Sequence, residues 1–147
     1  MDIESKKRLE LTNCLCARMR QSSRNMSQIY NKHLKASGEK INANQVSILV
    51  TISQVDDGSI NKISNLLKME RTTLTRNLNV LKKAGWVKSN KRSDGRFTYI
   101  SLTANGNKVL SNVFPHWSKA QEQVQKILGG ELDSFRKNLK NINTNLI

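Results

Sequence analysis

The stretch "RTTLTRNLNVLKKAGW", residues 71–86, decides the fold. Three leucines recur in it at helical spacing: Leu74, Leu78 and Leu81. Gly85 provides a stop signal at the end of the helix. Three threonines occupy the first turns: Thr72, Thr73 and Thr75. Threonine is a mediocre helix former because its branched β-carbon restricts χ1. The pattern predicts a helix over 71–84 that packs its leucines on a core and presents hydroxyl groups to a partner.

The segments before this helix predict two more helices. Asn42, with Gln45 three residues later, resembles a capping box that opens a helix from Ala43 to about Val55. "SINKISNLLKM", residues 59–69, reads as a short helix with three apolar residues inside: Ile63, Leu66 and Leu67. Only about three residues separate it from the helix at 71–84. This arrangement is typical of a helix-turn-helix.

The period changes to two after Gly85. "WVKSN" (86–90) and "FTYISL" (97–102) alternate apolar and polar residues, as half-buried strands do. "KRSDGR" (91–96) lies between them, with three cations and one glycine. A β-hairpin with a protruding basic loop, a wing, is therefore expected.

Long helices flank this middle part. A stripe in steps of three and four, beginning with Leu11, Leu15 and Met19, predicts one helix from about Arg8 to Leu34. Thr103 can cap another helix over 104–128. Pro115 should kink that second helix, and Gly129-Gly130 should end it. The last helix carries a coiled-coil-like seam: Leu132, Phe135, Leu139, Ile142 and Leu146.

The predicted fold is mainly α with a small β-hairpin: a winged helix-turn-helix with N- and C-terminal dimerisation helices. Residues 41–102 should form the winged lobe, and 1–40 with 103–147 a helical dimerisation region, in one continuous fold. The seams need a partner, and a second copy is the simplest one.

Charge limits the choice of partner. The chain of 147 residues has a net charge of +14, and residues 61–100 hold ten cations against two acids. A concentrated basic segment suggests a polyanion, although a solvated basic surface that keeps the protein soluble is the alternative.

No apolar run approaches the ~20 residues of a membrane span, and the charged N-terminal segment lacks the apolar stretch of a signal peptide. A cytoplasmic location without a membrane partner is expected.

One face of the helix at 71–84 is suited to reading DNA. With the leucines inward, the opposite face holds hydrogen-bond donors, and two more lie on its flanks: Thr72, Arg76, Asn79 and Lys83 on the face, Thr73 and Thr75 on the flanks. Short hydroxyls allow close approach to base edges, and an arginine can bond guanine through both of its terminal nitrogens. A cation at the helix start, Arg71, is unfavourable in isolation and sensible beside a polyanion. The alternative is that the threonines only cap the helix and Arg76 is a solvated charge.

The wing loop has a matching pattern. Asp94 can hold the guanidinium of Arg96, which could then enter a minor groove, while Lys91 and Arg92 can reach phosphates. Asp94-Gly95 is also a plain hairpin turn, and the two interpretations are compatible.

At this point the chain resembles the MarR family of winged-helix transcriptional regulators. Three segments carry the resemblance: "MERTTLTRNLNVLKKAGWV", "DGRFTYISLTANG" with its D-x-R and, five residues on, L-T-x-x-G, and "INANQVSIL". The resemblance implies a homodimer that binds pseudo-palindromic double-stranded DNA operators. It also implies that Thr72, Thr73 and Arg76 read bases in the major groove and that Arg96, supported by Asp94, enters the minor groove. One departure is Phe97, which stands where many members have a second arginine.

The resemblance also implies a signal that releases DNA, either a small-molecule effector or cysteine oxidation. Cys14 and Cys16 lie near the expected dimer interface, and Arg18 and Arg20 would favour a thiolate there. At helical spacing i, i+2 the two cysteines would point about 200° apart, which favours a bridge to a partner subunit over a bond between them. Both could equally be small buried hydrophobes. Met26, Tyr30 and Trp117 are candidate ligand-pocket residues, although such clusters are more often core.

Other classes of function have weaker support. The only histidines, His33 and His116, form no pair with metal-ligand spacing, so no metal or other cofactor is expected. No phosphate-binding glycine loop, nucleophile–base constellation or pair of acids indicates an enzyme. The remaining alternative is a winged-helix module that binds nucleic acid without sequence preference, double-stranded RNA included, or a protein.

Overall fold

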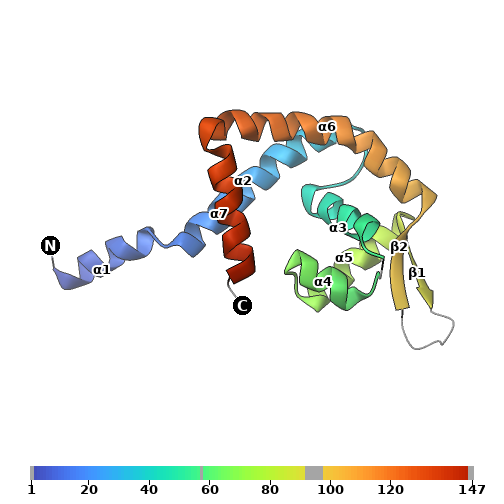
Figure 1. Cartoon of the computed structure of the whole chain (residues 1–147), viewed down its shortest axis with the longest axis horizontal. Coiled ribbons are helices and arrows are strands. Elements are labelled where there is room, and N and C mark those ends of the chain that lie inside the picture. Colours follow the sequence, from blue (N-terminus) through green and yellow to red (C-terminus); the bar gives the residue numbers. More distant parts are fainter. Residues whose placement is uncertain (1, 57, 92–97, 146–147) are drawn as a thin grey trace.

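The computed structural model describes residues 2–56, 58–91 and 98–145. Its elements are α1 (Ile3–Thr12), α2 (Leu15–Lys35), α3 (Ala43–Gln54), α4 (Ile60–Leu67), α5 (Arg71–Lys83), β1 (Val87–Lys91), β2 (Thr98–Leu102), α6 (Ala104–Leu128), the 3-10 turn η1 (Gly129–Glu131) and α7 (Leu132–Asn145). Figure 1 shows α3, α4, α5 and the hairpin gathered into one lobe, with α2 and α6 lying across it. The predicted fold class, mainly helical with a two-stranded wing, is confirmed.

Local signals determine the lobe's helices. The capping box at Asn42 is present, since the Asn42 side chain accepts from the Gln45 N–H and the Gln45 side chain accepts from the Asn42 N–H. Ser59 caps α4 through the Lys62 N–H. In α4, Ile63 is fully buried, whereas Leu66 is 59% exposed, so its predicted burial was wrong. The short helix directs Ile63 and Leu67 inward, and Leu66 falls beside that face.

The core of the lobe continues into the flanking helices. It is built from α3, α4, α5 and the hairpin, and it includes Leu34 of α2 with Val109 and Val113 of α6. β1 and β2 pair antiparallel, with Val87 opposite Leu102 and Lys91 opposite Thr98. No polar or charged residue among those described is buried. Apolar packing therefore joins the lobe to α2 and α6.

The N-terminal part differs from its prediction. One helix from Arg8 to Leu34 was expected, but the chain breaks at Asn13 and Cys14 into α1 and α2. The predicted stripe continues through the break yet contacts no core, because Leu11 is 72% and Leu15 81% exposed. Without packing to impose one helix, the non-helical backbone of Cys14 is tolerated.

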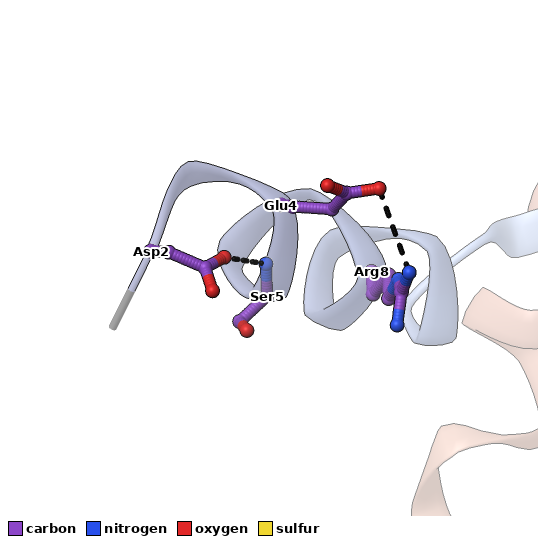
Figure 2. A network of polar contacts seen from close by, with 4 residues as sticks. All are labelled: Asp2, Glu4, Ser5 and Arg8. Atoms are coloured by element: carbon purple, nitrogen blue, oxygen red, sulfur yellow. Dashed lines mark hydrogen bonds and ion pairs between the residues drawn. The ribbon is translucent and has the colours of Figure 1, made fainter.

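The exposed helix α1 has no buried residue, and polar contacts link side chains along its first two turns, as Figure 2 shows. The Asp2 carboxylate accepts from the Ser5 N–H at 2.6 Å, and this bond holds the pKa of Asp2 below its usual value. Arg8 and Glu4 form an ion pair at 3.5 Å. In Figure 1, α1 extends away from the other elements.

The C-terminal helices follow the prediction closely. Thr103 caps α6 by accepting from the Gly106 N–H at 3.0 Å. Pro115 lies inside α6, and Figure 1 shows this helix changing direction along its length. Gly129 ends it with a φ of 53°. In α7, Leu132, Phe135 and Leu139 of the predicted seam are half-buried, whereas Ile142 is 42% exposed; Leu146 lies outside the described residues.

A row of polar contacts outside the core fixes α2 and the segment after it on α6. The Tyr30 hydroxyl donates to Gln121 Oε1, and His33 Nε2 lies 2.8 Å from Gln123 Oε1. Asn112 donates to Glu39 at 2.9 Å. We call these three pairs the α2–α6 polar seam.

Candidate nucleic-acid interface

The outer face of α5 carries the predicted reading residues. Its leucines are buried: Leu74 at 0%, Leu78 at 1% and Leu81 at 0% exposure. The six predicted DNA-binding residues on this helix are all exposed, as is Lys83: Arg71, Thr72, Thr73, Thr75, Arg76 and Asn79. The helical period thus separates the helix into one apolar face and one donor-rich face.

Most of these donors have no competing partner. The Thr75 hydroxyl donates to the Arg71 carbonyl at 2.8 Å, so its proton is used within the helix. Within the described ranges, the side chains of Thr72, Thr73, Arg76 and Asn79 make no hydrogen bond or ion pair. Their donors are therefore available to an external ligand.

A residue that the sequence analysis missed supports this face. Asn77 is half-buried, and its Nδ2 donates to the Thr73 carbonyl at 2.9 Å. Its Oδ1 accepts from Asn44 Nδ2 of α3 at 3.3 Å. The N-terminus of α3 is itself held to α2, because the Ala43 N–H donates to Asn31 Oδ1 at 2.7 Å. Side-chain amides thus connect α5 through α3 to α2.

The turn that joins α4 to α5 consists of Lys68, Met69 and Glu70, as the helix-turn-helix pattern predicted. Lys68 adopts a left-handed conformation with φ 50° and ψ 37°. The Met69 N–H donates to the Ser64 carbonyl at 3.0 Å, and the Ser64 hydroxyl donates back to the Met69 carbonyl at 2.5 Å. These bonds close α4 and set the position at which α5 begins.

Ion pairs within the described residues do not neutralise the charge of the lobe. The ion pairs found in the described ranges lie in α1 and between Arg136 and Asp133 of α7. Cations on the lobe are solvent-exposed without a carboxylate partner there: Lys62, Lys68, Arg71, Arg76, Lys83, Lys88 and Lys91. Such a surface attracts a polyanion.

The wing is described only in part. Lys91 is exposed at the end of β1. Arg92, Asp94 and Arg96, as well as Phe97, lie outside the described residues, so the predicted minor-groove contact stays a prediction.

Close backbone contacts hold the wing on the lobe. The Ile100 N–H donates to the Gly58 carbonyl at 2.7 Å, and Ser59 forms an isolated β-bridge with Tyr99. A Cβ on Gly58 would lie 2.0 Å from the Ile100 oxygen. Only glycine fits at this crossing, which the sequence pattern alone did not indicate.

A second junction connects the wing to α6. The Thr103 N–H donates to the Trp86 carbonyl at 3.0 Å, and the Thr103 hydroxyl donates to the Gly85 carbonyl at 2.6 Å. A Cβ on Gly106 would lie 2.1 Å from the Trp86 oxygen. The Thr and Gly of the L-T-x-x-G motif therefore have a structural role at the start of α6.

The two cysteines lie at the break between α1 and α2. Both thiols are free and exposed, which contradicts the alternative that they are buried hydrophobes. Cys14 is the N-cap of α2, with φ −58° and ψ 118°. The predicted divergence of about 200° assumed that both residues are helical, and this premise was wrong.

The candidate ligand residues are only partly brought together. An apolar cavity of about 210 Å³ lies between α3 and α6, lined by Val46, Val50, Leu110, Val113, Phe114 and Trp117. The ring of Tyr30 lies 6.4 Å from that of Trp117, and burial raises the pKa of Tyr30. Met26 is half-buried, and neither it nor Tyr30 lines the cavity.

The described part of the chain holds neither a cluster of metal ligands nor a helix that could span a membrane. No three His, Cys, Asp or Glu side chains gather there as metal ligands. Nor does any helix in that part have the length and apolarity to cross a membrane.

Comparisons with known proteins agree with this geometry. A family model described as a winged helix DNA-binding domain matches residues 41–106. The transcriptional repressor MprA of Escherichia coli strain K12 is 32% identical over 101 residues, which are 67% of this chain and 56% of that repressor. The match therefore spans little more than half of MprA.

Solved structures cover more of the chain. The M. tuberculosis transcriptional regulator MosR in complex with DNA is 31% identical, with a TM-score of 0.80 over 90% of this chain and 95% of that one. Overoxidized AbfR bound to DNA is 30% identical, with a TM-score of 0.70 over 97% and 99%. A mutant MarR from E. coli with operator DNA, at 20% identity, shares the fold, with a TM-score of 0.77 over 87% and 92%.

Proposed function

The chain belongs to the MarR family of winged helix-turn-helix transcriptional regulators, and from this premise we propose that it is a homodimeric repressor of a pseudo-palindromic DNA operator. The family is one of transcriptional regulators rather than of enzymes. MosR and AbfR, each at least 30% identical to this chain, have been solved with DNA. We assign the lobe of residues 41–102 to DNA and residues 1–40 and 103–147 to the dimer.

The observation that carries the proposal is the donor-rich face of α5. Thr72, Thr73 and Arg76 are exposed on it, and their side-chain donors have no partner among the described residues. We assign these three residues to base edges in the major groove and Arg71, Thr75 and Asn79 to the surrounding contacts. Lys91 and Arg92 would bind phosphates, and Arg96, held by Asp94, would enter the minor groove.

The experiment that tests this proposal is a binding titration by fluorescence anisotropy. The probes are a duplex from upstream of the protein's own gene and a random-sequence duplex of equal length, at several salt concentrations. We expect much tighter binding to the upstream duplex and a steep fall of affinity with salt. Equal affinity for the two duplexes would instead support the alternative, a general nucleic-acid-binding module.

The dimer is supported by apolar side chains exposed on the outer helices. Leu11 is 72%, Leu15 81% and Ile127 68% exposed in the single chain. Such side chains on α1, α2 and α6 gain stability by packing against a second copy. Light scattering at micromolar concentration should give twice the chain mass, and a monomer mass would contradict the proposed operator symmetry.

Oxidation of Cys14 or Cys16 is our first proposed release signal. Both thiols are free and exposed, so an oxidant can reach them. A bridge to the partner subunit and a bond between Cys14 and Cys16 are both open, because Cys14 is not helical. Peroxide treatment should weaken operator binding in the unaltered protein but not in a Cys14→Ser/Cys16→Ser variant. Unchanged binding in both proteins would remove oxidation from the mechanism.

A small-molecule effector is the second proposed signal. The apolar cavity beside Trp117 has the volume of a small aromatic molecule. An effector there should quench Trp117 fluorescence and weaken DNA binding, and a Val50→Trp variant that fills the cavity should resist it. Quenching without loss of DNA affinity would separate the cavity from regulation.

A further inference from the structure

The left-handed residue in the helix-turn-helix is unusual for this chain. Four described residues have a clearly positive φ, and three of them are glycines near the ends of helices: Gly38, Gly85 and Gly129. The fourth is Lys68, with a φ of 50°. A side chain with a Cβ is strained in this conformation, and glycine is the usual residue at a helix C-terminus of this type.

The fold does not use the Lys68 side chain. The bonds that close α4 here run from the Lys68 N–H to the Asn65 and Ser64 carbonyls, and glycine would make them equally well. The Lys68 side chain is exposed and makes no hydrogen bond or ion pair within the described ranges. Among the described residues, no contact of the Lys68 side chain therefore offsets this strain.

The position of Lys68 carries a second cost, which is electrostatic. Lys68 precedes α5 by three residues, at the end of that helix where the dipole is positive, and Arg71 adds a second cation there. The N-cap Glu70 has no side-chain capping bond. Both costs would be offset if an anion lay against this turn.

We propose that Lys68 is a phosphate-binding residue that anchors the helix-turn-helix on one wall of the major groove, an inference that rests on the proposed function. The turn leads directly into Thr72, so when Thr72 meets a base edge Lys68 lies beside the wall of a groove about 12 Å wide. The flexible lysine stem then carries the ammonium to a phosphate oxygen. This contact positions α5 and reads no base.

The test compares Lys68→Gly with Lys68→Arg in the full chain. Lys68→Gly should raise Tm by about 2–4 °C, because the strain is removed. It should also bind both the upstream and the random-sequence duplex more weakly. With two copies in a dimer, the slope of log affinity against log salt should become shallower by about 1.8. The loss of affinity of Lys68→Gly relative to the unaltered protein should therefore shrink about 12-fold as salt rises from 50 to 200 mM. Lys68→Arg should retain the Tm and the salt slope.

The matched control is Lys126→Ala, which removes one cation at the end of α6 remote from the lobe (Figure 1). Its salt slope should equal that of the unaltered protein. An unchanged slope and affinity in Lys68→Gly would overturn the inference while leaving the proposed function in place. If the unaltered protein binds neither duplex, the proposed function fails and this inference fails with it.

Discussion

Replacement of Gly106 by alanine tests the junction between the wing and α6. The added Cβ would lie 2.1 Å from the Trp86 carbonyl oxygen, and real Cβ atoms essentially never come closer than 3.0 Å. The obstacle is backbone on both sides, so no side chain can rotate away. The start of α6 must therefore move off the strand by about 1 Å.

The loss of unfolding free energy in Gly106→Ala follows from the hydrogen bonds and packing at this junction. Two hydrogen bonds cross it, from the Thr103 N–H to Trp86 at 3.0 Å and from the Thr103 hydroxyl to Gly85 at 2.6 Å. Their loss costs about 1–3 kcal/mol in total, and overpacking adds about 1–3 kcal/mol. Alanine in a helix returns about 1 kcal/mol relative to glycine. The expected net loss of unfolding free energy is about 1–5 kcal/mol.

The assay is urea unfolding followed by circular dichroism at fixed protein concentration. Gly130→Ala is the matched control, because a Cβ there meets nothing within 4 Å. We expect the control to be neutral or more stable by about 0.4–1 kcal/mol. If Gly106→Ala matches Gly130→Ala in stability, the close approach of α6 to Trp86 does not exist in solution and the reasoning is refuted.

Three further predictions concern the reading helix, the core and the polar seam. Arg76→Ala should weaken operator binding by about 1–3 kcal/mol and relax preference at one base position; an equal loss on random DNA would show that Arg76 contacts phosphate only. Leu78→Ala, at a position 1% exposed, should destabilise by about 2–5 kcal/mol, whereas Val80→Ala, 51% exposed on the same helix, should change stability little; similar losses would contradict the orientation of α5. Burial raises the pKa of Tyr30, so the neutral phenol stabilises the folded state. This contribution to the free energy of unfolding is complete below the unfolded-state pKa near 10 and is lost as pH rises through the higher folded-state pKa. Tyr30→Phe should therefore lose less stability than the unaltered protein between pH 9 and 11, and identical pH profiles would argue against the buried phenol.

Local patterns predicted the elements of the lobe because local forces form them. The Asn42 capping box, the Thr103 cap and the leucine period of α5 each involve residues within one or two helical turns. Interactions at this range are visible in the sequence as spacing. The predicted reading face is exposed for the same reason, since the buried leucines fix which side of α5 faces outward.

The errors arose where contacts between distant segments decide the structure. The stripe from Leu11 to Met19 predicts a continuous helix, but a stripe forms one helix reliably only if something packs on it, and in the single chain Leu11 and Leu15 are exposed. The glycine requirements at Gly58 and Gly106 come from backbone segments, at Ile100 and Trp86, that cross them from elsewhere in the chain. Asn77 was missed because its partner Asn44 lies 33 residues away.

The α2–α6 polar seam has a consequence for how such a protein can diversify. The core that joins these helices is wholly apolar in the described residues, so it holds them together without fixing a unique register by directional bonds. The directional contacts lie at its edge, in pairs such as Tyr30–Gln121 and Glu39–Asn112. Substitutions at these accessible positions can change the angle between α2 and α6 while every buried side chain is retained. In the homodimer that we propose, the separation of the two α5 helices, and with it the operator spacing, can thus change while the buried core is retained.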